Sequence, residues 1–567
     1  MNAALRLVSP VDSVRTLMKR AGLLGGLILL ASTGLPTSAA SAAEPFFEGL
    51  GSHSRKITTK SPKAQRYFDQ GIRFLYGFNH SAALRSFAEA AKLDPQCAMA
   101  HWAIALASGP HINFPLVPPP AAEVAWKELG LAKQHAAHGT LVERDLIEAL
   151  GHRYANPQPE DRTPLDRAYA DAMREVWKKY PHDADVGALF AEAMMDMRPW
   201  DQWTIEGEAQ PGTEEILATL DAVLVLDARH PFANHLYIHA VEASPYPERA
   251  DPAAERLRNL QPALAHNLHM PSHIDIRRGR WHQAIASNLK AVEADRGYRK
   301  VVGKPEGLVP VYAAHNRHML AYAALMTGQS ELALKHIRQM VAELPADFVK
   351  EFALMTEGFV AMPLEVLVRF GRWEAILKEP ENYPEYMPFT RAFHVAARAT
   401  AFAARLDAEK ARSEQQRFVQ RTALVPKEMY LGNNTGQSIL AVAAQMLEGE
   451  ILIAEGRLDE GLAKLREGAA LEDALKYDEP PGWMIPLRHV IGATLMRARR
   501  FEEAEKIYRE DLRRLPDNGW GLYGLAESLR EQGKPLDEFA SAHSKFKTVW
   551  AKSDIKITNS CLCQPRT

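Results

Sequence analysis

Apolar and small residues recur along the chain at intervals of three and four. In residues 64–95 they stand at Tyr67, Gly71, Phe74, Ala83, Phe87 and Ala90, and Pro95 ends the segment. Positions three and four residues apart are neighbours on a helix surface, so this pattern predicts two amphipathic helices joined by a short turn. The alternation typical of strands is almost absent, which favours an all-α fold.

The same helix pair recurs over most of the sequence. The clearest copies, with or without the closing proline, cover 231–262, 265–296, 314–345, 439–470 and 485–516, and less regular helix pairs fill 98–138, 183–230 and 353–380. This helix–turn–helix unit of about 34 residues resembles the tetratricopeptide-repeat (TPR) family. The resemblance implies a TPR-like α-solenoid, a right-handed superhelix whose first helices line a concave groove. In most members that groove binds a peptide.

Interruptions of the repeats define the expected domain organisation. We expect N-terminal TPR-like repeats with a proline-rich loop (109–120) over 44–230, central repeats over 231–345, C-terminal repeats over 346–554 and an irregular tail over 555–567. A second proline-rich loop at 378–389 and an insertion at 297–309 also break the repeat pattern.

Residues 1–43 have the pattern of a secretory signal peptide. Lys19 and Arg20 precede the apolar run AGLLGGLILLA, and small residues follow up to an expected cleavage site near Ala42 or Ala43. The apolar run is too short to span a bilayer, so we expect removal of the segment and export to the periplasm or the medium. No later apolar run approaches the ~18 residues of a membrane span, which predicts no membrane anchor.

The charge balance and the absence of motifs exclude several classes of function. The 567 residues include 68 Lys and Arg and 70 Asp and Glu, a formal net charge of −2. Without a basic surplus, we expect no nucleic-acid partner. The motifs C-x-x-C-H, H-E-x-x-H, G-x-S-x-G and Walker A are absent, so nothing supports covalent haem, serine hydrolysis or nucleotide binding. Cys561 and Cys563 either bind soft Cu(I) or form a disulfide, with Cys97 as one candidate partner.

Histidine is unusually concentrated. Nine of the 21 histidines fall within residues 230–318, less than a sixth of the chain. His235 and His269 are 34 residues apart, as are His239 and His273, so the spacing equals the repeat length. In the TPR family, positions 2, 5, 9 and 12 of the first helix face the groove. The resemblance implies that three successive repeats present these residues there: His235, His239, Glu242, His266, His269, His273, His315, His318 and Tyr322. His230 and His282 are off this stripe and should point elsewhere.

A bound metal accounts for such a cluster. Protonated imidazoles on helices ~10 Å apart would repel one another, whereas neutral imidazole is the commonest metal ligand. Pairs of histidines three or four residues apart chelate one ion. Seven histidines exceed the four ligands of one zinc, so two or three ions fit better. A ligand set made of imidazoles favours copper, with zinc or iron as alternatives. A di-iron carboxylate site would need several glutamates, and Glu242 alone lies on the stripe.

Neighbouring residues supply secondary candidates. Pro271 lies between His269 and His273 and either bends that helix or marks its start. Residues close to the ligands in sequence are candidates to orient imidazoles or a substrate: Tyr237, Asp275, Tyr312, Arg317 and Tyr322. A weaker candidate group in the first repeats contains His53, His80, Cys97, His101 and His111, of which His111, in the proline-rich loop, is best placed to reach inward. Trp200, Asp201 and Trp203 suggest an aromatic lip on the groove, although the pattern favours buried packing.

The sequence thus predicts an exported TPR-scaffold metalloprotein with a multi-histidine, multinuclear centre. The most concrete function is a copper-dependent oxidoreductase acting on a small molecule, with Glu242 as ligand or general base and Tyr237 and Tyr322 as catalytic candidates. Two alternatives remain open at this point. One is a protein that sequesters metal without turnover, and the other is a TPR scaffold for a peptide or protein partner.

Overall fold

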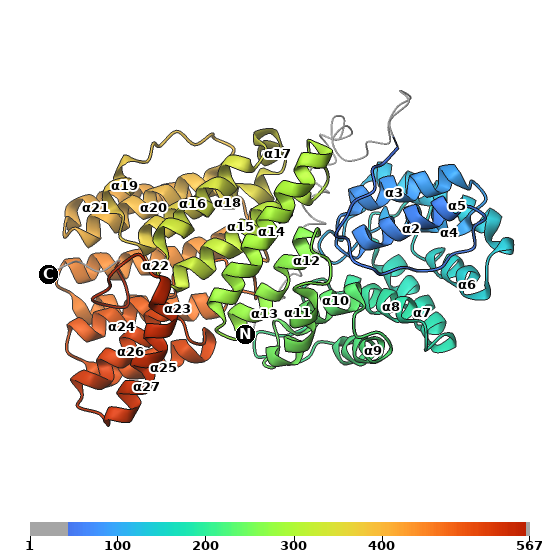
Figure 1. Cartoon of the computed structure of the whole chain (residues 1–567). Coiled ribbons are helices and arrows are strands. Elements are labelled where there is room, and N and C mark those ends of the chain that lie inside the picture. The colour runs from blue at the N-terminus through green and yellow to red at the C-terminus, as the bar shows by residue number, and fades with distance from the viewer. Residues whose placement is uncertain (1–42, 563–567) are drawn as a thin grey trace, which may run out of the picture. The chain divides into compact units, whose positions relative to one another are not determined.

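The computed structural model describes residues 43–562 and is built almost entirely from α-helices (Figure 1). The described residues contain one short two-stranded ribbon, β1 (Tyr430–Leu431) and β2 (Asn434–Thr435). The fold is all-α, and its helices pair as antiparallel hairpins in the manner of a TPR-like α-solenoid, as predicted. The predicted signal peptide lies outside the described residues, apart from residue 43.

The chain forms two compact units. The first contains the residues up to Ile274 and Lys290–Tyr312, and the second contains Asp275–Leu289 and the residues from Ala313 onward.

The first unit is a succession of helices on one hydrophobic core. Its helices are α2 (Pro62–Leu75), α3 (His80–Leu93), α4 (Ala98–Ala107), α5 (Pro119–His135), α6 (Leu141–Leu150), α7 (Thr163–Lys179), α8 (Ala184–Asp196), α9 (Thr213–Leu226), α10 (Pro231–Val241), α11 (Asp251–Leu257) and α12 (Ala265–His269), with 3-10 turns at Ala136–His138 and Pro247–Ala250. Helices α13 (Pro271–Arg277), α14 (Trp281–Val302) and α15 (Val309–Met326) each contribute residues to both units.

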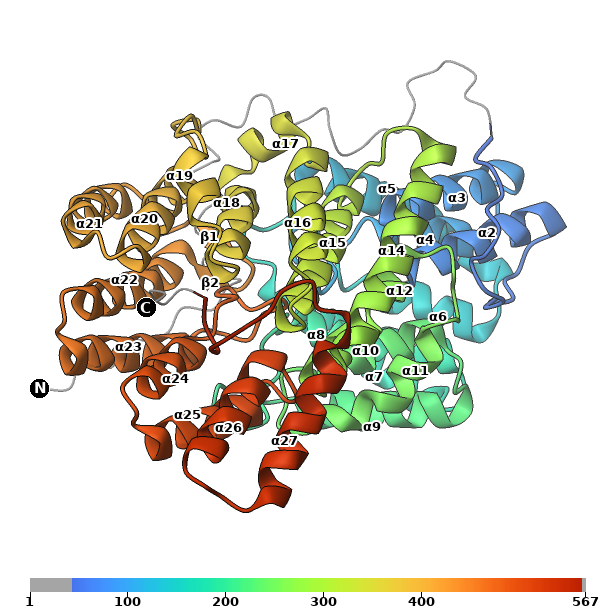
Figure 2. The same cartoon turned by 60° about the vertical axis from the view of Figure 1, so that its left-hand side comes forward.

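The second unit is also built from helical hairpins, which stack on one another in order from yellow to red in Figure 2. Its helices are α16 (Ser330–Glu343), α17 (Ala346–Glu351), α18 (Ala353–Arg369), α19 (Trp373–Lys378), α20 (Pro388–Ala404), α21 (Ala408–Thr422), α22 (Gly436–Ala454), α23 (Leu458–Asp473), α24 (Leu487–Arg497), α25 (Phe501–Arg514), α26 (Gly519–Glu531) and α27 (Leu536–Val549), followed by a 3-10 turn at Trp550–Lys552.

The first hairpin shows how the sequence specifies this architecture. Ser61 caps α2 by accepting a hydrogen bond from Ala64 N at 3.2 Å, and Asn79 caps α3 in the same way from Ala82 N at 3.1 Å. Gly71 lies directly against the ring of Phe87, where a Cβ would overlap the ring. The glycine therefore lets two helices approach closely, and its place in the predicted repeat has a steric reason.

One helix of the second unit is apolar enough for comparison with a membrane span. By length and composition α22 is long and apolar enough to cross a bilayer, but 61% of its apolar window is buried within the protein. A core helix has the same properties, and α22 packs against α20 and α23 in the second unit.

Candidate metal centre

Helix α10 carries the first predicted ligands. His235 and His239 are one turn apart, and Glu242 follows at the C-cap of the helix. Every residue of α10 is buried, so both imidazoles lie in the protein interior. Pro231 occupies the first turn and His230 caps it, its Nδ1 accepting from Ala233 N at 3.2 Å.

The next ligands lie on two short helices. Pro271 is the first residue of α13, and α12 ends at His269, so the proline separates two helices. Of the two predicted roles, it therefore marks a helix start. His266 and His269 are held on α12 and do not fall in a loop, and both are buried.

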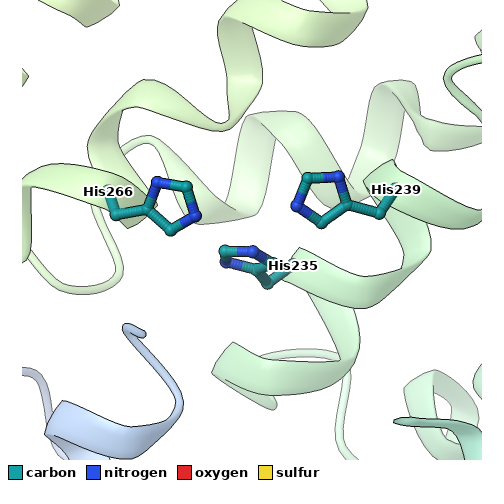
Figure 3. Close-up of side chains that lie close together, drawn as sticks. All are labelled: His235, His239 and His266. Carbon is teal, nitrogen blue, oxygen red and sulfur yellow. The ribbon is translucent and has the colours of Figure 1, made fainter. Parts of the chain in front are cut away.

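Three imidazoles converge between α10 and α12. One ring nitrogen from each of His235, His239 and His266 lies within 4.8 Å of the other two (Figure 3). The ring centre of His235 is 4.9 Å from that of His239 and 5.0 Å from that of His266. We call these residues the three-histidine cluster. Their convergence places three nitrogen donors in one metal-sized volume.

The amide of Asn267 fixes the tautomer of His235. Asn267 Nδ2 donates to Gln261 Oε1 and, at 3.3 Å, to the carbonyl oxygen of Tyr76, so its Oδ1 faces the imidazole. His235 Nδ1 therefore donates to Asn267 Oδ1 at 2.6 Å and carries the proton. The lone pair of His235 is consequently on Nε2, which has no hydrogen-bond partner among the described residues.

Glu242 fixes the tautomers of two further histidines. His239 Nδ1 donates to Glu242 Oε1 at 2.9 Å, and His273 Nδ1 donates to Glu242 Oε2 at 2.6 Å. Each ring therefore keeps its lone pair on Nε2, and that of His239 has no partner within the described part of the chain. A carboxylate behind a ligating imidazole is the usual second layer of a metal site.

A second pair of imidazoles adjoins the first cluster. His269 Nε2 and His273 Nε2 are 2.6 Å apart, and the ring centres of His239 and His273 are 5.5 Å apart. Residues 269 and 273 are one helical turn apart in sequence, yet they belong to different helices because Pro271 interrupts the backbone. The structure thus brings together five of the seven predicted histidines, together with Glu242, in the first unit.

Burial keeps two rings of the three-histidine cluster uncharged. The pKa of His235 and that of His239 are both held well below the ordinary value, first by burial and then by the neighbouring imidazoles. Both rings are therefore neutral at pH 7, which is the form that ligates a metal.

Each ring of the three-histidine cluster packs against an aromatic side chain. Phe78 stacks on His235 with ring centres 4.4 Å apart, and Tyr312 stacks on His266 at 4.3 Å. Trp200 meets His239 edge-on at 4.7 Å. Phe78 and Trp200 both have positive φ angles, of 59° and 60°, which are rare for aromatic residues. Such strained backbone is typical of functional sites.

The proline-rich loop covers these aromatic residues. Its three consecutive residues His111, Ile112 and Asn113 each contact a different one. The ring centre of His111 is 5.6 Å from that of Phe78, Trp200 Nε1 donates to Ile112 O at 3.1 Å, and Asn113 Nδ2 donates to Tyr312 OH at 3.2 Å. The loop therefore reaches inward at His111, as the sequence suggested, but acts through the aromatic layer and not directly on the cluster.

Several predicted residues lie elsewhere. Tyr237 is two residues from both His235 and His239, hence on the opposite face of α10, and its pKa is raised first by burial and then by Asp221. It does not reach the three-histidine cluster. His315, His318 and Tyr322 are on the part of α15 that belongs to the second unit.

The weaker histidine group of the first repeats does not form one site. His53 and His230 both contact Asp185 Oδ1, at 3.0 and 3.1 Å, and His101 contacts Glu128 at 2.6 Å. Two other members of the group, His80 and His111, stack with ring centres 4.0 Å apart. Cys97 is a buried free thiol, whereas Cys561 is disulfide-bonded and Cys563 lies outside the described residues.

The two histidines expected to lie off the stripe point away from the predicted site. His230 Nε2 contacts Asp185, and His282 Nε2 donates to the carbonyl oxygen of Val549 at 3.0 Å, as expected for residues off the stripe. Sequence reasoning missed Asn267 and Phe78. Asn267 could have been noticed because it lies between two predicted ligands, His266 and His269, but no pattern in the sequence connects Phe78 with His235.

Comparisons with known proteins give no closer identification. No protein-family model matches the chain, and no curated protein sequence matches it either. Among the solved structures with similarity, the human IFIT1 dimer with m7Gppp-AAAA is 12% identical, with 88% of this chain and 92% of that chain covered and a TM-score of 0.31. The TPR domain of P58(IPK) is 13% identical, with 86% of this chain and 92% of that chain covered and a TM-score of 0.19. A circular tandem repeat protein with novel repeat topology is 12% identical, with 86% of this chain and 95% of that chain covered and a TM-score of 0.16. At these TM-scores the fold assignment rests on the chain's own helical hairpins.

Proposed function

We propose that this protein is a metalloprotein that binds a transition-metal ion through His235, His239 and His266. One observation carries the proposal: the lone pairs of His235 and His239 are on Nε2 atoms that lack hydrogen-bond partners among the described residues. Their Nδ1 atoms are held by Asn267 and Glu242. A buried nitrogen without a partner is costly, and a metal ion removes that cost.

The proposal includes a second ion beside the first. The tautomer of His273 directs its lone pair to Nε2, the atom that faces His269 Nε2 at 2.6 Å. Since Glu242 bonds both His239 and His273, one carboxylate links the two ligand sets. His315 and His318 remain predicted ligands, as the sequence pattern indicates.

Copper is the proposed metal. All-imidazole ligation suits copper, zinc and iron, and in the Irving–Williams order copper binds most tightly. Three protein ligands also leave a coordination position for a small molecule, the arrangement of catalytic metal sites. We therefore propose a copper-dependent oxidoreductase with a small-molecule substrate, in an exported protein.

Metal analysis of variants tests this proposal. Purified protein would be loaded with copper, zinc or iron in turn, freed of excess metal by gel filtration, and analysed for metal per chain. We expect His235→Ala and His239→Ala to lower the copper content while circular dichroism stays unchanged, because apolar packing holds a solenoid together. His282→Ala should match the wild type. Metal near zero after all three loadings would refute the proposal.

A measurement of turnover distinguishes a copper-dependent enzyme from a protein that only stores metal. Oxygen consumption by the copper-loaded protein would be measured with a panel of small reductants. Consumption that His239→Ala abolishes supports the oxidoreductase, whereas stoichiometric copper without any consumption supports sequestration.

A further inference from the structure

The interior of the second unit contains an arginine that none of the described acidic residues pairs with directly. Arg369 is fully buried at the end of α18, and the indole of Trp520 covers its guanidinium at 3.7 Å. Its Nη2 donates to His489 Nδ1 at 2.9 Å. Its Nε and Nη1 have no hydrogen-bond partner within residues 43–562.

In this network the imidazole of His489 lies between Arg369 and the nearest carboxylate, that of Asp511. His489 Nε2 donates to Asp511 Oδ2 at 2.9 Å, and Asn518 Nδ2 donates to the same oxygen at 2.8 Å. Asp511 is thus engaged by two donors and makes no ion pair with Arg369 in the described part of the chain. Burial lowers the pKa of Arg369 to about 9, so the guanidinium still carries its charge at pH 7.

Two further buried polar groups accompany this arginine. Glu365 lies one turn before Arg369 on the same face of α18, yet its Oε1 accepts from Met484 N at 2.6 Å. Glu365 Oε2 and the hydroxyl of Tyr322 have no hydrogen-bond partner among the residues described. Both side chains are at most 1% exposed.

These groups form a set of hydrogen-bond donors. Burial raises the pKa of Glu365 to about 8, so its carboxyl is protonated at pH 7 and carries an O–H. Burial keeps the pKa of Tyr322 well above its ordinary value, so the phenol also keeps its proton. Arg369 interacts electrostatically with Tyr322, and Tyr322 with Glu365. A buried guanidinium and two buried hydroxyls without partners among the described residues match the needs of an oxyanion.

We propose that Arg369, Tyr322 and Glu365 bind a small oxyanion, a carboxylate or a phosphate group, inside the second unit. The oxyanion compensates the buried positive charge and accepts hydrogen bonds that no described residue accepts. The site is independent of the proposed metal centre, because none of these three residues is among its ligands in the first unit.

Calorimetric titration of the metal-free full chain tests the site. Inorganic phosphate, acetate and succinate would be titrated separately at pH 7, and the probe that saturates identifies the group. We expect Tyr322→Phe to weaken binding by about tenfold, the value of one hydrogen bond to a charged group. This variant removes only a hydroxyl that no described residue bonds, so it should fold. Arg369→Gln should weaken binding by about a hundredfold or more.

The control is Tyr523→Phe, which removes the hydroxyl of a half-buried tyrosine on α26 whose ring contacts Phe546. It should bind as the wild type does. If none of the three probes binds, or if binding is the same in Tyr322→Phe and Arg369→Gln as in the wild type, the oxyanion site does not exist. Metal binding by the first unit would be unaffected by either result, so the two proposals fail separately.

Discussion

His239 Nδ1 lies 2.9 Å from Glu242 Oε1, and this contact decides which nitrogen of the ring is available for a metal. The second oxygen of the same carboxylate does the same for His273. Glu242 therefore determines the chemistry of two imidazoles without being required as a ligand itself. This role adds to those of ligand or general base, which the sequence suggested for Glu242 and which stay predictions.

Glu242→Gln should weaken metal binding while preserving the fold. The amide keeps an oxygen acceptor for one imidazole but loses the charge and the second acceptor. We expect a loss of about 10- to 100-fold in metal affinity, measured by competition with a chelator. Glu467→Gln, on the exposed face of α23, is the matched control. Equal metal affinity in Glu242→Gln and Glu467→Gln would contradict the role of Glu242 in positioning the imidazoles.

The proline-rich loop should control the exchange of metal. Asn113→Ala removes the hydrogen bond to Tyr312, the residue stacked on His266. We expect chelator to extract metal about three- to tenfold faster, as for the loss of one hydrogen bond, with circular dichroism unchanged. Gln96→Ala, an exposed amide, should leave the rate unchanged. A wild-type rate in Asn113→Ala would argue against a covering role.

Buried carboxyls in the second unit should make stability fall as the pH rises. The folded pKa of Glu365 is about 8, against an ordinary value of 4.5, so between these pH values the folded state binds more protons than the unfolded state. The free energy of unfolding should therefore fall through this window, by at most about 1.4 kcal/mol per pH unit for one group. Glu365→Gln should flatten the dependence in urea unfolding at pH 5 to 8. An unchanged slope would contradict the assignment.

A methyl group at Gly71 should push apart α2 and α3, the two helices of the first hairpin. Gly71→Ala places a Cβ in the ring of Phe87, and we expect a loss of about 1–3 kcal/mol in the free energy of unfolding. Gly130 lies in the middle of α5, and a Cβ on it would meet no atom of the described residues within 4 Å. Gly130→Ala should therefore stabilise the protein by up to ~1 kcal/mol. Urea unfolding measures both, and a neutral Gly71→Ala would contradict the close approach.

Sequence periodicity was sufficient to predict the helical hairpins, because each helix buries one stripe of regularly spaced side chains. The 34-residue spacing also indicated that His235 is related to His269, and His239 to His273. Pro271 left two local structures open, since a proline is compatible with both a bend and a helix start.

Long-range packing could not be predicted in the same way. Phe78 and Trp200 reach the cluster through backbone conformations with positive φ, which no residue pattern indicates for aromatic side chains. Arg369 has an acid four residues before it, a spacing at which ion pairs commonly form on a helix surface. Only the tertiary structure shows that His489 and Met484 N engage these two side chains separately.

X-ray absorption of the copper-loaded protein tests the central claim most directly. The account predicts a first shell of nitrogen atoms at about 2.0 Å with the multiple scattering of imidazole, and fewer imidazoles in His239→Ala. His282→Ala should give the wild-type spectrum. A first shell of sulfur, a shell of oxygen without imidazole scattering, or a spectrum unchanged in His239→Ala would contradict the three-histidine metal centre.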